Sequence, residues 1–310
     1  MGTISYLCLR KHSNMEKDKP KELALEFLRD SNIVIHAEHR FINNELGIIN
    51  SFFLMKSNFF NTGQPYRAKE GRIIRGISGE AVFSINLIQY TLSTKAMIII
   101  PPNSLIELIS YSDDFNFQAI VPGNDFLPEQ YRNHFTSSYT NRNVIIPMNE
   151  AEWQQAGTFF SLLWDIVHAV PFRREVAQHL ITALLHNVRY IESCQQTAAP
   201  TPLSRQKDVF RRFISLVNEY SKQERTIGFY ADKLCLTPHY LSTVIREASG
   251  QTVMEWINQA VILEAKVLLK HSSLLVFQIS DELNFPNPSF FSKFFKRMTG
   301  MTPAEYQKQE

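Results

Sequence analysis

The chain has 310 residues, which is long enough for two domains that each bury a core of their own. Its composition, 44% hydrophobic and 20% charged, is that of a globular protein and excludes an intrinsically disordered one. Three scattered cysteines, Cys8, Cys194 and Cys235, argue against a disulfide framework and fit a reducing compartment. No apolar run approaches the ~18 residues of a membrane span, so we expect a cytoplasmic protein without a membrane segment.

The net charge of +2 is distributed unevenly along the chain. Residues 201–310 hold 14 Lys and Arg against 11 Asp and Glu, whereas residues 1–200 hold 18 against 19. The excess at the C-terminal end is small. It would not by itself indicate a nucleic-acid-binding protein, so the positions of the charges have to carry that argument.

The first half of the chain has the pattern of an antiparallel β domain. A short helix is expected over 21–29, and from Ile33 to Val121 runs of β-branched and aromatic residues alternate with Asn, Gly and Pro clusters. Such runs, for example 48–55, 72–77, 81–85 and 98–100, predict short strands in a sandwich or barrel.

Two amphipathic helices are predicted next, over 151–169 and 173–193, separated by Pro171. They form either a partner surface or a cover for the sheet, and the sequence leaves both open. The proline-containing segment around 195–202 has no periodicity and indicates a linker. We therefore expect an α+β protein of two domains: an N-terminal domain of residues 1–195 with a sandwich or barrel over about 33–145 and the helix pair, a linker over 196–204, and a helical domain over 205–310.

The helical domain contains the same sequence pattern twice, over 226–250 and 275–300. Each copy contains a short helix, a tight break, a second helix and a closing glycine, Gly250 or Gly300. Thr237 before Pro238 is a strong helix start, and Asn284 is expected in the left-handed conformation that ends a helix. Ser204 is expected to cap a further helix over 205–221, ahead of the first copy. The duplicated pattern predicts two helix-turn-helix units.

A longer amphipathic helix over 252–270 separates the two units. At 1.5 Å per residue it spans about 27 Å, against about 34 Å for one turn of B-DNA. The second helices of the two units can therefore enter successive major grooves on one face of a duplex. By helical period, the residues that face outward are His239, Ser242, Thr243 and Arg246 in the first unit and Ser292, Lys293, Lys296 and Arg297 in the second.

Residues 226–306 closely resemble the DNA-binding domain of the AraC/XylS-type family of bacterial transcription regulators. The resemblance is carried by five ordered segments: 230–234 (YADKL), 237–242 (TPHYLS), 265–269 (AKVLL), 284–296 (NFPNPSFFSKFFK) and 300–306 (GMTPAEY). Two positions depart from the family pattern. Val261 stands where the family commonly has Arg, and Asn284 where it usually has Gly.

The resemblance implies a transcription regulator that binds double-stranded promoter DNA, with RNA polymerase as a partner and no cofactor. Its base-reading residues would be His239, Ser242, Thr243, Asn287, Ser289, Ser292 and Lys293, and its phosphate-binding residues Arg246, Lys296 and Arg297. Lys293 is expected on a guanine, because a long cationic donor fits the O6 and N7 acceptors. The family plan also implies a cupin-like β-barrel with a dimerising helix pair, a small-molecule effector and a homodimer.

Two other functions are considered. One is a cupin-type enzyme or a small-molecule-binding protein with an accessory DNA-binding domain. A cupin-type barrel can hold a metal, and His36, Glu38, His39 and Glu45 form the one candidate metal cluster. On a strand, His36 and His39 would point to opposite faces, so no metal site and no catalytic residue is expected. A DNA-binding protein without an effector remains open, and so does the direction of regulation.

Overall fold

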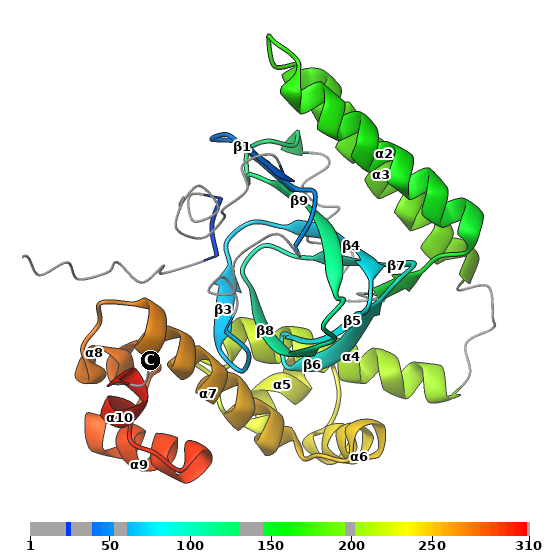
Figure 1. Cartoon of the computed structure of the whole chain (residues 1–310). Helices are drawn as coiled ribbons and strands as arrows, with labels where there is room; N and C mark the ends of the chain where they lie inside the picture. Colours follow the sequence, from blue (N-terminus) through cyan, green and yellow to red (C-terminus); the bar gives the residue numbers. More distant parts are fainter. Residues whose placement is uncertain (1–22, 26–38, 53–60, 130–144, 196–201, 309–310) are drawn as a thin grey trace, which may run out of the picture.

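The computed structural model describes residues 23–25, 39–52, 61–129, 145–195 and 202–308. Ten strands make two antiparallel sheets (Figure 1). The strands are β1 (Arg40–Ile42), β2 (Leu46–Ile49), β3 (Pro65–Ala68), β4 (Arg72–Ser78), β5 (Glu80–Ile85), β6 (Ile88–Ser93), β7 (Ala96–Ile100), β8 (Ser104–Tyr111), β9 (Asn116–Pro122) and β10 (Ile145–Pro147).

The six-stranded sheet has the order β1-β2-β9-β4-β7-β10, and the four-stranded sheet has the order β3-β8-β5-β6. Among the described residues the two sheets are not joined into a closed ladder, so the predicted barrel is an open, two-sheet structure instead. The apolar faces of both sheets meet in one core, to which Ile74, Phe83, Leu92, Ile106 and Phe117 contribute. The expected β domain is present, but it does not close.

Two long helices cover the outer face of the six-stranded sheet (Figure 1). They are α2 (Glu150–His168) and α3 (Arg174–Gln195), within two residues of the predicted bounds. Asn149 caps α2 and forms a capping box with Glu152, which explains why the helix begins there. Leu163 and Leu184 pack with Ile73 of β4 in a second core. Of the two roles left open for this helix pair, covering the sheet is therefore one that it fills.

The predicted helix over 21–29 is wrong where the structure describes it. Leu23 forms a parallel β-bridge with Ala68, and its side chain is 1% exposed. The buried Arg72 guanidinium donates a hydrogen bond to the Leu23 carbonyl. The long-range partners of Leu23 therefore outweighed its local helical periodicity.

The C-terminal part is all helical. Its helices are α4 (Pro202–Tyr220), α5 (Ile227–Lys233), α6 (Pro238–Ser249), α7 (Val253–His271), α8 (Val276–Glu282), α9 (Pro288–Thr299) and α10 (Pro303–Lys308). The helices α4 and α7 lie within three residues of the helices predicted over 205–221 and 252–270, and α5, α6, α8 and α9 lie within the two predicted units. Ser204 lies inside α4 and does not cap it, because α4 begins with Pro202, a residue favoured in the first helical turn.

The C-terminal helices pack against the four-stranded sheet. Leu263 and Val267 of α7 contact Leu105 of β8 in a small buried cluster. In Figure 1, α7 lies between the sheets and the pair α6 and α9, so that α6 and α9 are on the side of the molecule away from the sheets.

Candidate nucleic-acid interface

The first helix-turn-helix unit consists of α5 and α6. After α5, Cys235 adopts a positive φ of 57°, which turns the chain sharply. The side chain of Thr237 then accepts a hydrogen bond from the backbone N–H of Tyr240, and Pro238 opens α6. Gly250, with φ 74°, ends α6 in the left-handed conformation, as the sequence predicts.

The second unit consists of α8 and α9 and repeats this geometry with a longer turn. Asn284 has φ 52°, which confirms the predicted left-handed residue, and Asn287 caps α9 by accepting from the N–H of Phe290. The starts of α5 and α8 are 49 residues apart, whereas those of α6 and α9 are 50 apart. The turn of the second unit therefore contains one residue more.

Both units bury equivalent faces. In the first, Tyr230, Leu241 and Ile245 are fully buried, and in the second Phe291 and Phe295 are. These are the residues that the helical period assigned to the core. Because the inner face of each second helix is fixed by packing, its outer face is presented in one orientation.

The predicted base-reading residues all lie on these outer faces. His239, Thr243, Asn287, Ser289 and Lys293 are exposed, and Ser242 and Ser292 are half-buried. The hydroxyls of Ser242 and Thr243 donate to the carbonyls of Pro238 and His239, at 2.8 and 3.1 Å. Since these protons are engaged within the helix, the two hydroxyl oxygens are left to accept hydrogen bonds, which fits an amino group of adenine or cytosine.

Asn287, which is predicted to read bases, has a structural role in the helix cap. Its Oδ1 accepts from the N–H of Phe290 at 3.0 Å, so the amide is oriented by the helix cap. The Nδ2 group remains to donate to a base or a phosphate.

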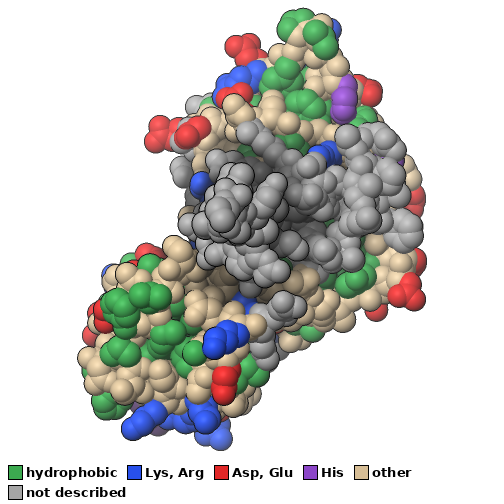
Figure 2. Space-filling view, turned by 60° about the vertical axis from the view of Figure 1, so that its left-hand side comes forward, with side chains coloured by type: hydrophobic (Ala, Val, Ile, Leu, Met, Phe, Trp, Pro, Cys, Tyr) green, Lys and Arg blue, Asp and Glu red, His purple; other side chains and the backbone are tan. Residues whose placement is uncertain are grey.

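The predicted phosphate-binding residues are exposed, and the second unit carries more positive charge. Lys293, Lys296 and Arg297 all lie on α9, which has no acidic residue, whereas Arg246 on α6 is followed by Glu247. Arg297 lies over the ring of Phe294, with its guanidinium carbon 5.6 Å from the centroid. Figure 2 shows Lys and Arg side chains gathered at the lower end of the lobe that the C-terminal helices form.

Two exposed aromatic residues were not among the predicted site residues. Tyr240 and Phe290 are 43% and 60% exposed, although both lie in the first turn of a recognition helix. Counting from the two N-caps would have revealed them, because each is the third residue after its cap.

The second unit also touches the segment that connects α4 to the first unit. The guanidinium of Arg225, just before α5, donates to the carbonyl of Leu283 and lies 3.9 Å from the ring centroid of Phe285. Burial lowers the pKa of Arg225. The side chain of Asn284 donates to the carbonyl of Gln223 at 3.0 Å. Asn284 therefore adds a hydrogen bond to the segment before the first unit, whereas Gly at this position would supply only conformational freedom.

The spacer helix α7 belongs to the cores of both units. Trp256, Ile257 and Ala260 pack with the first unit, and Ile262, Ala265 and Leu269 pack with the second. Val261, which replaces the family's usual arginine, is fully buried. With 19 residues, α7 extends over about 28 Å and sets the separation of α6 and α9.

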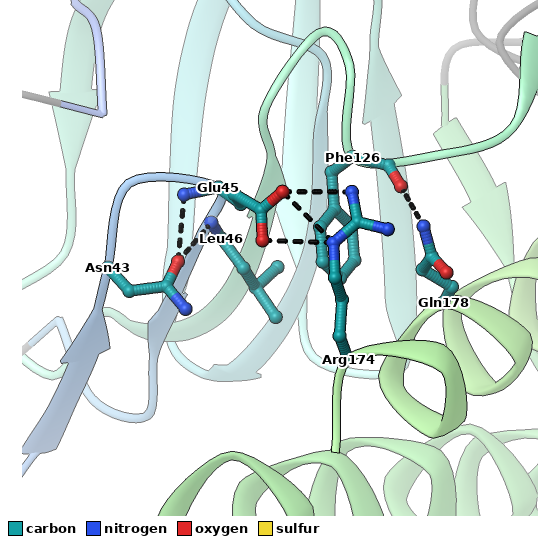
Figure 3. A network of polar contacts seen from close by, with 6 residues as sticks. All are labelled: Asn43, Glu45, Leu46, Phe126, Arg174 and Gln178. Carbon is teal, nitrogen blue, oxygen red and sulfur yellow. Dashed lines mark hydrogen bonds and ion pairs between the residues drawn. The ribbon is translucent and has the colours of Figure 1, made fainter. Parts of the chain in front are cut away.

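The candidate metal cluster is not assembled in the part that the structure describes. His36 and Glu38 lie outside the described residues. Glu45 pairs with Arg174 at the start of α3, where the arginine Nε lies 3.0 Å from each carboxylate oxygen (Figure 3). The ion pair with Glu45 raises the pKa of Arg174. The ion pair between Glu45 and Arg174 thus joins α3 to the β1–β2 hairpin. Among the described residues, no group of three His, Cys, Asp or Glu is suited to hold a metal.

Known proteins are similar to this chain in sequence. Residues 230–309 match the family model described as a helix-turn-helix domain. The transcriptional activator RhaR of Escherichia coli K12 is 28% identical over 141 residues, which are 44% of this chain and 48% of RhaR; the Shigella flexneri protein of that name matches equally. The chain thus spans about half the length of the curated relatives it matches.

Two solved structures are also similar. ToxT of Vibrio cholerae, bound to an unsaturated fatty acid, is 17% identical with a TM-score of 0.42, over 86% of this chain and 95% of ToxT. The C-terminal domain of AraT, a response regulator of Geobacillus stearothermophilus, is 22% identical with a TM-score of 0.32, over 36% of this chain and 89% of that one.

Two helix-turn-helix units on a shared spacer helix define a class of DNA-binding proteins. Within that class, residues 230–309 form a helix-turn-helix domain of the AraC type. The RhaR proteins are named as transcriptional activators. No helix in the described part of the chain is long and apolar enough to cross a membrane.

Proposed function

We propose that this protein is a sequence-specific transcription regulator that binds promoter DNA through residues 205–310. The observation that carries the proposal is the pair of recognition helices, α6 and α9, held on the same side of the molecule by one buried spacer helix (Figure 1). Their first turns are the part of a helix-turn-helix unit that contacts base edges. The spacer helix between them, about 28 Å long, is comparable with the ~34 Å of one turn of B-DNA, so the two helices fit successive major grooves.

Within this interface we assign the roles by geometry and charge. His239, Ser242 and Thr243 read bases for α6, and Asn287, Ser289, Ser292 and Lys293 read bases for α9. Arg246, Lys296 and Arg297 bind phosphates. Since α9 carries three of these cations and no acid, the second unit contributes most of the electrostatic attraction.

Selection of random duplexes by the full-length protein tests the proposal. We expect enrichment of two half-motifs about one helical turn apart. Enrichment of no motif would contradict a sequence-specific regulator. Selection by the fragment 200–310, run in parallel, shows whether the N-terminal part restrains DNA binding.

Lys293 and Lys296 make a matched pair for separating base reading from phosphate binding, because they lie one turn apart on α9. We expect Lys293→Ala to lose about 1–3 kcal/mol of discrimination at one base pair. Lys296→Ala should weaken binding to all sequences alike and reduce the salt slope by about one. Binding titrations against the selected site and random DNA at several salt concentrations measure both. Equal losses on both DNAs for both variants would refute these roles.

We propose that residues 1–195 form the regulatory domain, joined by a linker that ends where α4 begins at Pro202, and that its sheets are an open relative of the cupin barrel. The space between the sheets measures about 30 Å³, which is enough for little more than a water molecule. A cleft of about 510 Å³ lies instead between β6, β8 and α4, and its walls include Tyr90, Ser104 and Arg211. That volume is in the range of small-molecule sites, so we place the effector there.

Filling the cleft tests this assignment. Ser215→Trp, on the α4 wall, should abolish any metabolite-dependent change in promoter activity and leave the affinity for DNA unchanged. A variant that still responds would contradict an effector in this cleft.

We further propose that the protein acts in the cytoplasm as a homodimer and contacts RNA polymerase. We also propose that it is an activator, because the relatives it matches are named as transcriptional activators. Dimerisation would use the outer face of α2 and α3, where Leu162 and Tyr190 are 46% and 69% exposed. The mass in solution at micromolar concentration checks this, and a monomer would count against it.

A further inference from the structure

Tyr240 and Phe290 occupy the same position in the two recognition helices. Each is the third residue after its N-cap and follows a proline at the first helical position. The cap side chains, Thr237 and Asn287, accept from the backbone N–H of these two residues at 3.2 and 3.0 Å. The position of each aromatic residue is therefore fixed by the helix cap.

Packing within the protein does not explain these side chains. Their neighbours one residue on, Leu241 and Phe291, are fully buried, whereas Tyr240 is 43% and Phe290 60% exposed. Within the described part of the chain neither ring stacks on another aromatic ring. Burial of a phenylalanine ring exposed to this degree by a binding partner is favourable.

The first turns of these helices are poorly equipped to bind a phosphate. Pro238 and Pro288 have no N–H, and the N–H groups of Tyr240 and Phe290 are bonded to the caps. A side chain in a helix also points back toward the N-terminus, so the two rings cover the leading end of each helix. That end is the part that approaches base edges in the major groove.

We propose that Phe290, and Tyr240 at the equivalent position, read thymine by apolar contact with its C5 methyl group. The methyl group of thymine is the one apolar feature of the major-groove code. The serine, threonine and lysine side chains around the rings supply hydrogen bonds, so the two aromatic residues add a distinct kind of readout. The inference rests on the proposed DNA-binding function and specifies part of what it recognises.

The experiment replaces thymine by deoxyuridine, which lacks only this methyl group. Using the full-length protein and its selected duplex, each thymine of the two half-motifs is replaced in turn and the dissociation constant is measured at fixed salt. We expect one position in the half-motif of the second unit to weaken binding by about three- to five-fold, the effect of one methyl group lost from apolar contact.

Phe290→Ala should weaken binding to the thymine duplex and lose this sensitivity, so that thymine and deoxyuridine duplexes bind equally. Phe277→Ala is the matched control, because Phe277 is 50% exposed in the same unit but lies on α8. It should keep the sensitivity of the unmodified protein. Tyr240→Ala should remove the corresponding effect in the other half-motif only.

Three outcomes would overturn the inference. One is a selected motif with no position sensitive to deoxyuridine, which would leave the regulator function intact. Another is a Phe290→Ala variant that folds, by its thermal transition, and retains the full sensitivity. A protein that selects no motif at all would remove this inference together with the proposed function.

Discussion

Two residues in left-handed backbone conformation control the turns of the recognition units. Cys235 has φ 57° and Asn284 has φ 52°, and neither is glycine. Asn tolerates this conformation and here also donates a hydrogen bond to Gln223 in the segment between α4 and α5. Cys235 is an exposed free cysteine. The same backbone requirement is thus met with a compensating contact in the second unit.

Glycine substitutions separate these two cases. Cys235→Gly should raise the free energy of unfolding by about 0.5–1 kcal/mol, because it relieves the left-handed strain without loss of a bond like that from Asn284 to Gln223. Asn284→Gly should give no gain or a loss of about 1 kcal/mol, since the hydrogen bond to Gln223 is removed. Urea unfolding measures both. A clear stabilisation by Asn284→Gly would show that the bond contributes nothing.

At the scale of the element, each unit is followed by the same helix start. Thr252 and Glu255 form a capping box at α7, and Thr302 and Glu305 repeat it at α10. The backbone N–H of Thr252 or Thr302 donates to the carboxylate and lowers the pKa of Glu255 and Glu305. These carboxylates therefore fix where the chain re-enters a helix after Gly250 and Gly300.

The lowered pKa of both glutamates makes this capping dependent on pH. A carboxyl whose pKa is lower in the folded state stabilises the fold above its unfolded pKa, ordinarily 4.5, and loses that stabilisation as the pH falls through the folded value. The double variant Glu255→Gln and Glu305→Gln should therefore lose less stability on acidification below about pH 5. Urea unfolding at several pH values measures this. Glu282→Gln is the control, because Glu282 is an exposed residue at the end of α8. If this control variant and the double variant lost stability equally on acidification, the prediction would be contradicted.

At the scale of the whole molecule, α7 has a third buried face that is turned toward the sheets. Glu264 is 4% exposed and accepts from Arg67 of β3, and Lys222 lies 3.4 Å from the same carboxylate oxygen. His271 contacts the carbonyl of Pro65 at 2.9 Å. Because α7 also positions α6 and α9, its contacts with β3 link the sheets to the helix that sets the spacing of the recognition helices.

Removal of Arg67 tests the strength of this connection. Arg67→Ala should destabilise the protein by about 1–3 kcal/mol, because it leaves a buried carboxylate with Lys222 as its remaining ionic partner. Adding Glu264→Gln should restore part of the loss, since the uncompensated charge is gone. A double-mutant cycle by urea unfolding measures the coupling. Losses that add within about 0.5 kcal/mol would show that the two side chains act independently.

The helices and turns of the C-terminal part could be predicted from the sequence because their signals are local. Thr237 before Pro238, glycine at 250 and 300, and an apolar residue every three or four positions act within one or two turns of helix. The outward direction of Lys293 and Lys296 follows from the same period. Tyr240 and Phe290 could have been found by the same counting, but an exposed aromatic residue contradicts the expectation that such residues are buried.

Non-local features could not be predicted in this way. The sequence by itself determined the two helix-turn-helix units and their spacer, because caps, turns and amphipathic period are written in adjacent residues. Only the tertiary structure decided that the sheets remain open, that Leu23 pairs with Ala68, and that Glu264 of α7 meets Arg67. The last two contacts join residues 45 and 197 positions apart. Such pairings depend on which apolar faces remain to be covered after the local elements have formed.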